Sequence, residues 1–465
     1  MPVQSVPETP AALALSPALG LSSVLPVLLA GGRGSRLFEL TEAEAKPALP
    51  LLVQSGQALR MIDFTMANLM RSGLQRAIVA TEYCPKTLQR HLGHRWNAAF
   101  PGGLRLRDGA DMTQGGYLGT GHAVAANSAE IDALAPDDLL ILSGDHVYEM
   151  DYGPLIRAHR ASDAAITVAV THVPLAQAQA FGVVDAEATA GSASPIRAFA
   201  EKPIRPRASR DQPDQALVSM GVYVADWRWL REVLGKAMAR AENGVDFGHD
   251  ILPAAVATGL AQCWVFPAPR NRATAYWRDV GTLDALRETI LDLTGFPPPC
   301  ALPGPTAGAQ TGAGAGRLSS LGSAVVDLLL PSVPRVPPTA LLEESVLLPG
   351  ARPGPGMRLK RVLVAPDTQL PAGLVIGEDP AEDARWFRRT EQGTVLVSAA
   401  MLARRAAERR RLVPVQLAPK TDPLKVMAMA TGAILGGPAG RSGPPAVIMT
   451  RSAAEISAFR VWLKP

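Results

Sequence analysis

Cysteine is scarce in this chain, whose 465 residues include only Cys84, Cys263 and Cys300. The three lie far apart, so they have neither the short spacings of a metal site nor the even number of a disulfide framework. A disulfide-rich secreted fold is therefore excluded. Because few and scattered cysteines are typical of proteins in a reducing compartment, we expect a cytoplasmic location.

A strong charge imbalance and a long apolar run are also missing. The formal net charge is +4 and no long block of lysine and arginine stands out, so binding to nucleic acid or to a membrane surface is not expected. No apolar run approaches the ~20 residues that span a bilayer. Residues 1–23 lack early basic residues and contain prolines, which indicates a mobile leader rather than a signal peptide. The basic stretch 403–411 could form a nucleic-acid patch, but we favour a solvated helix face.

The length predicts two or three domains, and 47% hydrophobic residues suffice for a good core. Between residues 24 and 295, short β-branched runs alternate with helical stretches, which predicts an α/β domain with ligands at the carboxyl ends of its strands. The expected strands include 77–81, 139–143 and 166–170, and the expected helices include 64–72 and 123–133.

The texture changes after a Pro/Gly/Ala-rich linker at 296–317. Beyond it, short apolar triplets are separated by proline and glycine, and Val346 and Val364 stand three hexads apart. This spacing favours a left-handed β-helix over 318–408. No clear pattern follows, so residues 409–465 are predicted to be an extension of unknown role.

A glycine cluster follows the apolar run in VLLAGGRGSRL, residues 27–37. A dinucleotide-binding turn fails because Arg36 takes the place of its third glycine, and a P-loop fails because no Gly-Lys-Ser/Thr closes it. What remains is a turn whose backbone N–H groups can approach phosphate oxygens, with Arg33 as an added cation. A purely structural turn is the alternative that the loop alone leaves open.

Further stretches of the chain, between residues 25 and 405, complete a pattern in one order. They read LAGGRGSRL, AKPALP, RMIDFTMAN, ILSGDHVYEMDY, FGVV, EKP, SMGVYV, VDFGHDILP, YWRDVGTLDA, GLVIGEDPAEDARWF and QGTVLVSAAML. In these the chain resembles the sugar nucleotidyltransferases, and closely the glucose-1-phosphate adenylyltransferases (ADP-glucose pyrophosphorylases) of bacterial glycogen synthesis. The resemblance implies a Rossmann-like domain with a mixed, mainly parallel sheet, followed by a left-handed parallel β-helix.

The resemblance also implies a reaction in which ATP and α-D-glucose 1-phosphate give ADP-glucose and pyrophosphate. Arg33 and Lys46 would then pin the triphosphate, and both are expected to be catalytic together with Asp145. The backbone of Gly31, Gly32 and Gly34 would bind the nucleotide. Taken without the family, Lys46 would be interpreted as a surface lysine.

Two aspartates are expected to hold Mg²⁺. Asp145 follows an apolar strand and Asp279 lies in the YWRDVGT phrase, and carboxylates converging on phosphate-bound Mg²⁺ suit a hard cation. A turn or helix-cap role is the alternative for Asp145. A zinc site with His146 and His249 is not favoured, because no third ligand has a suitable spacing.

The EKP phrase is the sugar-phosphate element of the family. By resemblance, Lys202 should grip the phosphate of glucose 1-phosphate and Glu201 a glucose hydroxyl. Alone, an aromatic residue of this group would be interpreted as core. The other residues expected at the sugar are Tyr117, Gly182, Ser219, Asp246 and Phe247.

The chain departs from the family in two regions. Around Tyr117 the usual Gln-Gln-Arg and Trp-Tyr-Arg-Gly-Thr-Ala-Asp segments are replaced, and Glu82 stands where glutamine is usual, which puts base selectivity in question. Most of the basic residues that bind effectors are also absent, with Arg60 the main one retained, so control by fructose 1,6-bisphosphate or AMP should be weak. The replacing residues are Ala43, Glu44, Pro50, Ala365, Pro366, Ala399 and Ala403.

Three functions stay open from the sequence. The first is an active adenylyltransferase, expected as a homotetramer with ATP and glucose 1-phosphate as its small-molecule partners. The second is a weakly catalytic or non-catalytic modulatory subunit of a hetero-oligomer, although such subunits tend to lose the residues equivalent to Arg33 and Lys46. The third is a sugar nucleotidyltransferase that uses another base.

Overall fold

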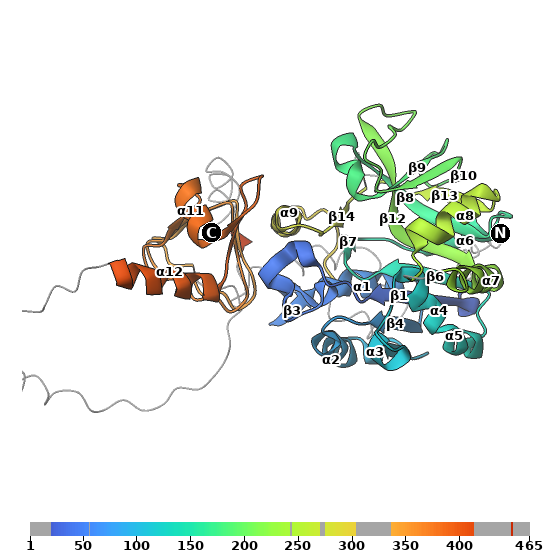
Figure 1. Cartoon of the computed structure of the whole chain (residues 1–465), viewed down its shortest axis with the longest axis horizontal. Coiled ribbons are helices and arrows are strands. Elements are labelled where there is room, and N and C mark those ends of the chain that lie inside the picture. The colour runs from blue at the N-terminus through green and yellow to red at the C-terminus, as the bar shows by residue number, and fades with distance from the viewer. Residues whose placement is uncertain are drawn as a thin grey trace, which may run out of the picture. The chain divides into compact units, whose positions relative to one another are not determined.

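The computed structural model describes residues 20–54, 56–241, 244–269, 275–303, 336–412 and 448–449 (Figure 1). They fall into two compact units. The first is built from the chain up to Gly32 and from Phe64–Trp277, whereas the second combines Arg33–Asp63 with the residues from Arg278 onward. The segment after the first two loop glycines thus groups with the residues after Arg278. The domain bounds expected from the sequence stay predictions. The predicted boundaries at 296 and 318 flank residues that are mostly outside the described ranges.

A ten-stranded mixed sheet forms the first unit, in the order β10-β13-β8-β12-β6-β1-β4-β5, with β9 and β11 off this path. Strands β5, β4, β1 and β6 are parallel, and β12 runs antiparallel to β6 and β8. The expected mixed, mainly parallel sheet is thus confirmed. The strands are β1 (Val24–Ala30), β4 (Ala77–Thr81), β5 (Leu104–Asp108), β6 (Asp138–Ser143), β8 (Ile166–Pro174), β9 (Gly182–Asp185), β10 (Ala193–Pro195), β11 (Ala198–Glu201), β12 (Gln215–Asp226) and β13 (Ala261–Val265).

The strands of this sheet are buried because their apolar runs contact helices. Val27, Ile141 and Val168 share one core cluster with Leu230 and Ile251, which lie on helical segments. The helical segments are η1 (Leu21–Ser23), α1 (Ile62–Arg71), α2 (Pro85–Arg95), η4 (Asn97–Ala99), α3 (Gly109–Met112), α4 (Thr120–Ala126), α5 (Ser128–Leu134), α6 (Gly153–Arg160), η5 (Leu175–Ala180), α7 (Trp227–Met238), η6 (Phe247–Ile251) and α8 (Leu252–Ala257).

The helix expected over 123–133 is in fact two helices that meet at Asn127. The Asn127 side chain turns back and donates from Nδ2 to the Ala123 carbonyl (2.8 Å) and to the Tyr117 hydroxyl (3.1 Å). An asparagine side chain bonded to nearby polar groups competes with helix continuation. The break therefore has a local chemical cause that the apolar pattern does not contain.

The second unit joins a hairpin and one helix to a coil of short strands. Buried Arg287 of α9 donates to Thr394 Oγ1 (3.0 Å) and to the Glu344 carbonyl (3.0 Å), which ties α9 to the coil. Figure 1 shows α11 and α12 beside the coil strands. The elements are η2 (Ser35–Thr41), η3 (Lys46–Ala48), β2 (Pro50–Gln54), β3 (Gln57–Arg60), α9 (Leu283–Thr294), β15 (Leu341–Glu343), β16 (Ser345–Leu347), β17 (Arg358–Lys360), β18 (Val362–Val364), β19 (Val375–Ile376), α11 (Pro380–Trp386), β20 (Arg388–Arg389), β21 (Val395–Val397), α12 (Ala399–Leu412) and β22 (Ile448–Met449).

The coil has the parallel pairing of a β-helix, but its period is 17 residues. Leu341 pairs with Arg358, and Val346 pairs with Leu363. The repeat of three hexads (18 residues) that the positions of Val346 and Val364 indicate is therefore one residue too long. Left-handed backbone recurs with this period, at φ 46° and 54° in Glu344 and Arg361, and at φ 83° and 54° in Gly350 and Asp367. The corners thus set the repeat, and apolar side chains such as Leu347 and Val364 fill the interior.

Among the helices that the structure describes, none is long and apolar enough to cross a membrane.

Candidate active site

The glycine loop leaves β1 at its carboxyl end and needs glycine for two different reasons. A Cβ on Gly31 would lie 3.0 Å from Glu82 Cβ. Gly34 has φ 66°, and a Cβ there would lie 2.8 Å from Lys46 Cβ. Because a Cβ would be crowded at both positions and strained at the second, only glycine keeps the backbone N–H groups of this turn accessible.

Lys46 is buried, with 5% of its surface exposed, which contradicts the surface-lysine interpretation. It begins η3, where Pro47 follows it. Its Nζ donates to Asp279 Oδ1 at 3.0 Å. A buried ammonium needs an anionic partner, and Asp279 supplies it. Two residues expected in the site from distant parts of the sequence are thus brought together.

Asp145 lies in the turn between β6 and β7 (His146–Tyr148), so it caps no helix. Ser143 Oγ donates to Asp145 Oδ1, and His146 Nε2 lies 3.6 Å from the same oxygen. A side chain on Gly32 would meet Asp145 Oδ2 at 4.0 Å. The carboxylate therefore lies beside the glycine loop, at the carboxyl edge of the sheet where the sequence places it.

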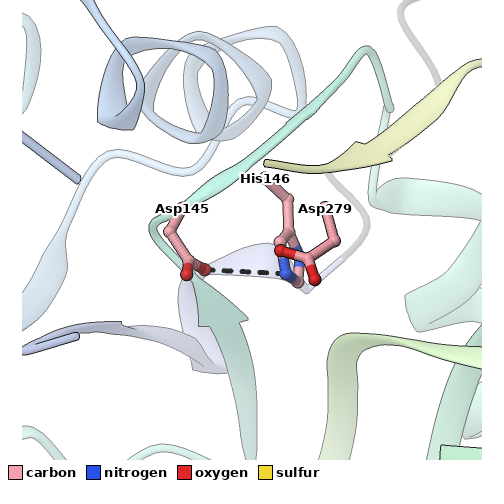
Figure 2. Close-up of side chains that lie close together, drawn as sticks. All are labelled: Asp145, His146 and Asp279. Atoms are coloured by element: carbon pink, nitrogen blue, oxygen red, sulfur yellow. Dashed lines mark ion pairs between the residues drawn. The ribbon is translucent and has the colours of Figure 1, made fainter. Parts of the chain in front are cut away.

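Strand β7 pairs with β14 (Trp277–Asp279), and the boundary between the two units falls inside β14. Figure 2 labels the potential metal ligands Asp145, His146 and Asp279. Two of these three are carboxylates, a donor set that favours a hard cation over zinc. His249 instead lies beside Asp246 (Nδ1–Oδ1, 3.9 Å) and is exposed, so the structure gives no support to the zinc alternative.

The residues expected to bind the sugar phosphate lie around Glu201, at the end of β11. A Cβ on Gly182 would come within 2.8 Å of Glu201 Oε2, and one on Gly248 within 2.5 Å. These two glycines therefore form a niche around the carboxylate. Lys202 Nζ lies 2.9 Å from Glu201 Oε1, and its side chain is 61% exposed.

Tyr223, which sequence reasoning missed, links the remaining residues of this group. Its hydroxyl accepts from Ser219 Oγ (3.3 Å), and its ring stacks on Phe247 with centroids 5.3 Å apart. Burial raises the pKa of Tyr223 to about 12, so its hydroxyl keeps its proton at neutral pH. Ser219 and Tyr223 lie four residues apart on β12, on either side of a register shift. The signal in the sequence that could have indicated Tyr223 was its position on the same strand as Ser219.

Asp246 is held by a hydrogen bond that the sequence did not indicate. Thr120 Oγ1 donates to Asp246 Oδ2 (3.0 Å) and accepts from the Phe247 N–H (3.0 Å).

Trp277 was also missed, although it lies in the YWRDVGT phrase. Its ring meets the rings of His146 and Phe181 edge to face, with centroids 5.2 Å and 5.3 Å apart. Trp277 therefore links His146 of the candidate cation site with Phe181, which precedes Gly182 of the sugar niche.

Tyr117 makes contacts other than the expected packing on the sugar. Its ring clusters with Ala80 and Ala123, and its hydroxyl donates to the Arg107 carbonyl (3.3 Å). Its backbone N–H donates to Glu82 Oε1 (2.8 Å). Burial raises the pKa of Glu82. Tyr117 thus belongs to the core beside the nucleotide loop, and its contact with the sugar stays a prediction.

Comparison with known proteins identifies both parts of the chain. A nucleotidyl transferase family model matches residues 25–295, and a GlmU-like C-terminal hexapeptide model matches residues 315–397. The glucose-1-phosphate adenylyltransferase of Jannaschia sp. (strain CCS1) is 36% identical over 410 residues, which cover 82% of this chain and 96% of the relative. That of Rhodopseudomonas palustris (strain HaA2) is 38% identical, with coverage of 81% and 96%. The chain belongs to the glucose-1-phosphate adenylyltransferase family of nucleotidyltransferases.

Proposed function

We propose that the chain transfers the adenylyl group of ATP to α-D-glucose 1-phosphate, giving ADP-glucose for α-glucan synthesis. The observation that carries this proposal is the buried Lys46–Asp279 pair beside Gly34. It places a fixed cation and a carboxylate at the loop that phosphates can approach. The names of the relatives support the choice of substrates.

In the proposed reaction, a phosphate oxygen of glucose 1-phosphate attacks the α-phosphorus of ATP. The new P–O bond forms as the bond from that phosphorus to the bridging oxygen breaks, and pyrophosphate leaves. Such a transfer depends on positioning and on neutralising charge. Arg33 and Lys46 supply positive charge for the leaving pyrophosphate. Because Asp279 already holds Lys46, little reorganisation is needed during the reaction.

Asp145 and Asp279 each offer a carboxylate to a divalent cation, and Mg²⁺ is the expected ion because oxygen ligands and phosphates suit it. When bound, it would neutralise charge on the triphosphate. Ser143 donates a hydrogen bond to the Asp145 carboxylate, with His146 beside it, and Lys46 holds that of Asp279. Both carboxylates are therefore oriented by the chain itself.

In the sugar half of the site, Glu201 would accept hydrogen bonds from glucose hydroxyls within the niche of Gly182 and Gly248. Lys202, with its exposed ammonium, would bind the phosphate. The indole Nε1–H of Trp277 is buried without a hydrogen-bond partner among the described residues. We propose that it donates to the bound sugar phosphate, because an unused buried donor is costly.

A steady-state assay of the purified full chain tests this function. Pyrophosphate release is measured with glucose 1-phosphate and ATP, UTP or dTTP, each with Mg²⁺. We expect turnover with ATP and little with the two pyrimidine nucleotides. Faster turnover with UTP or dTTP than with ATP would show that the chain uses another nucleotide as its substrate. No turnover with any of the three would favour the modulatory subunit. No finding favours that alternative, since Arg33, Lys46, Asp145 and Asp279 are all present. The homotetramer and the cytoplasmic location stay predictions.

Five of the seven residues that replace effector-binding cations line one cavity of about 580 Å³ in the second unit, and the retained Arg60 lines it too. Within it, Arg60 Nη1 lies 3.3 Å from Glu44 Oε2 and also donates to the Ala48 carbonyl. The retained cation is therefore neutralised by Glu44. Ala399 and Ala403 do not line this cavity. The lining comprises Glu39, Leu40, Ala43, Glu44, Pro50, Val53, Gly56, Ala58, Arg60, Pro349, Gly350, Ala365, Pro366 and Asp367.

We therefore propose that control by anionic effectors is weak. Each charge-assisted bond to a phosphate is worth ~1–3 kcal/mol, so losing several weakens binding by orders of magnitude. Fructose 1,6-bisphosphate at millimolar concentration should activate less than about twofold, and AMP should not inhibit, because Glu44 takes up the charge of Arg60. Initial rates at subsaturating ATP measure both effects.

Strong, saturable activation by fructose 1,6-bisphosphate would contradict this prediction. A variant that ends at Glu408 then locates the cause. If activation disappears in it, cations of the extension, such as Lys420, Lys425 or Arg441, provide the site. These three residues lie outside the described ranges.

A further inference from the structure

The segment that follows the glycine loop contains one strained residue. Phe38, inside η2, has φ 52° and ψ −125°, and its side chain is 41% exposed. A bulky residue in this region of backbone conformation is costly, so it persists only where neighbouring contacts enforce it. Because the ring is largely exposed, its burial contributes little stability, and another contact is needed to keep Phe38 in this conformation.

Arg388 of β20 supplies that contact. Its Cζ lies 4.1 Å from the centroid of the Phe38 ring. The same guanidinium binds Glu39 in a bidentate pair, with Nε 2.9 Å from Oε2 and Nη2 2.6 Å from Oε1. The hydrogen bond from Arg388 lowers the pKa of Glu39, so the pair is charged at neutral pH. One side chain of the β-helix therefore contacts two consecutive residues of η2.

This contact is close to the residues proposed to bind the triphosphate. Leu37 N donates to the Gly34 carbonyl (2.8 Å), and Thr41 Oγ1 donates to the same oxygen (2.9 Å), which closes η2 onto the loop. Gly34 in turn contacts Lys46. A shift of Phe38 and Glu39 would therefore move Gly34, the neighbouring Arg33 and the Lys46 side chain.

We propose that Arg388 is a positioning residue for nucleotide binding. It holds η2 by stacking on Phe38 and pairing with Glu39, and through η2 it fixes the loop that carries Arg33 relative to Lys46. The proposal rests on the proposed function, in which this loop binds the triphosphate. A lysine could form the ion pair but could neither stack as a plane nor bind both carboxylate oxygens. The β-helix thereby contributes to the catalytic site without contacting substrate.

The test compares Arg388→Ala and Arg388→Lys with the wild-type full chain. ATP binding is measured by titration calorimetry with Mg²⁺, and KM for ATP, KM for glucose 1-phosphate and kcat are measured by pyrophosphate release. Arg388→Ala should weaken ATP binding and raise KM for ATP about 5- to 20-fold. The KM for glucose 1-phosphate should change less than about twofold, because Lys202 and Glu201 are untouched. For Arg388→Lys, the ATP affinity and the KM for ATP should lie between the values of the wild type and of Arg388→Ala.

The matched control is Arg358→Ala, which breaks a similar pair on the coil (Arg358 Nε–Glu378 Oε1, 2.8 Å) away from η2. It should leave ATP binding unchanged. The double variant Glu39→Arg with Arg388→Glu should restore part of the ATP affinity, which loss of stability alone would not explain. If Arg388→Ala lowers the unfolding temperature while ATP binding stays at the wild-type value, or if Arg358→Ala has an equal effect, the proposal is overturned. A wild-type chain that binds no ATP would instead contradict the proposed function, and this proposal with it.

Discussion

Asp145→Asn should lower kcat by about a thousandfold, because the amide keeps the shape of the carboxylate but lacks the charge that holds a cation against the triphosphate. Pyrophosphate release at saturating ATP and glucose 1-phosphate measures this loss. Activity of the wild type should likewise disappear with EDTA and return with added Mg²⁺. Asp145 is the better position for this test than Asp279, since removing Asp279 would leave Lys46 buried without its anion.

A second aspartate in the same region provides the control. Asp151 Oδ1 accepts from the Gly153 N–H at the start of α6, so Asp151→Asn changes the same chemical group without touching the site. It should retain near-normal turnover. If Asp145→Asn also turns over near the wild-type rate, the cation is held elsewhere and its assignment here is wrong.

Lys202→Ala should raise the KM for glucose 1-phosphate by about 10- to 100-fold, because a charge-assisted bond to the sugar phosphate is lost. The KM for ATP should change less than about threefold, since Lys202 lies with Glu201 in the sugar niche. Stability should hardly change, because exposed ion pairs contribute little. Steady-state kinetics with each substrate varied in turn, together with thermal unfolding, separate these effects.

Lys236→Ala is the matched control for Lys202. It breaks the exposed pair with Glu232 (2.5 Å) on α7, a helix that contains none of the proposed site residues. It should change neither KM. If the KM for ATP changes more than the KM for glucose 1-phosphate in Lys202→Ala, this lysine belongs to the nucleotide half of the site.

The strands of the first unit could be predicted because their apolar runs are continuous. The strand expected at 77–81 coincides with β4, and the one at 139–143 forms most of β6. Parallel strands buried on both faces carry this signal in the sequence itself. The site at their carboxyl ends followed, since Asp145 comes directly after β6. Lys46 could be assigned only by resemblance, because its burial and its pairing with Asp279 join residues 233 positions apart.

Other features could not be predicted for the same reason of distance. The contact of Arg388 with Glu39 joins residues 349 positions apart, and no periodicity reports it. The role of Glu44 as an internal partner of Arg60 depends on side-chain geometry, because Glu44 precedes the β2–β3 hairpin and Arg60 ends it. In the coil, three of the left-handed corners fall at Glu344, Arg361 and Asp367, where the sequence has no glycine to mark them.

The 17-residue period of the coil limits how this region can change in length during evolution. Deleting one residue from a coil would turn the inward positions of the affected strand outward, because side chains alternate between the two faces of a strand. Removing or duplicating a whole coil would instead preserve every corner. The chain already contains one departure from this rule: Val362 pairs with Val395, 33 residues on, and α11 lies in the excursion between them. A helix can therefore replace regular coil here, provided that the chain returns in register, and such excursions are where relatives of this protein should differ most in length.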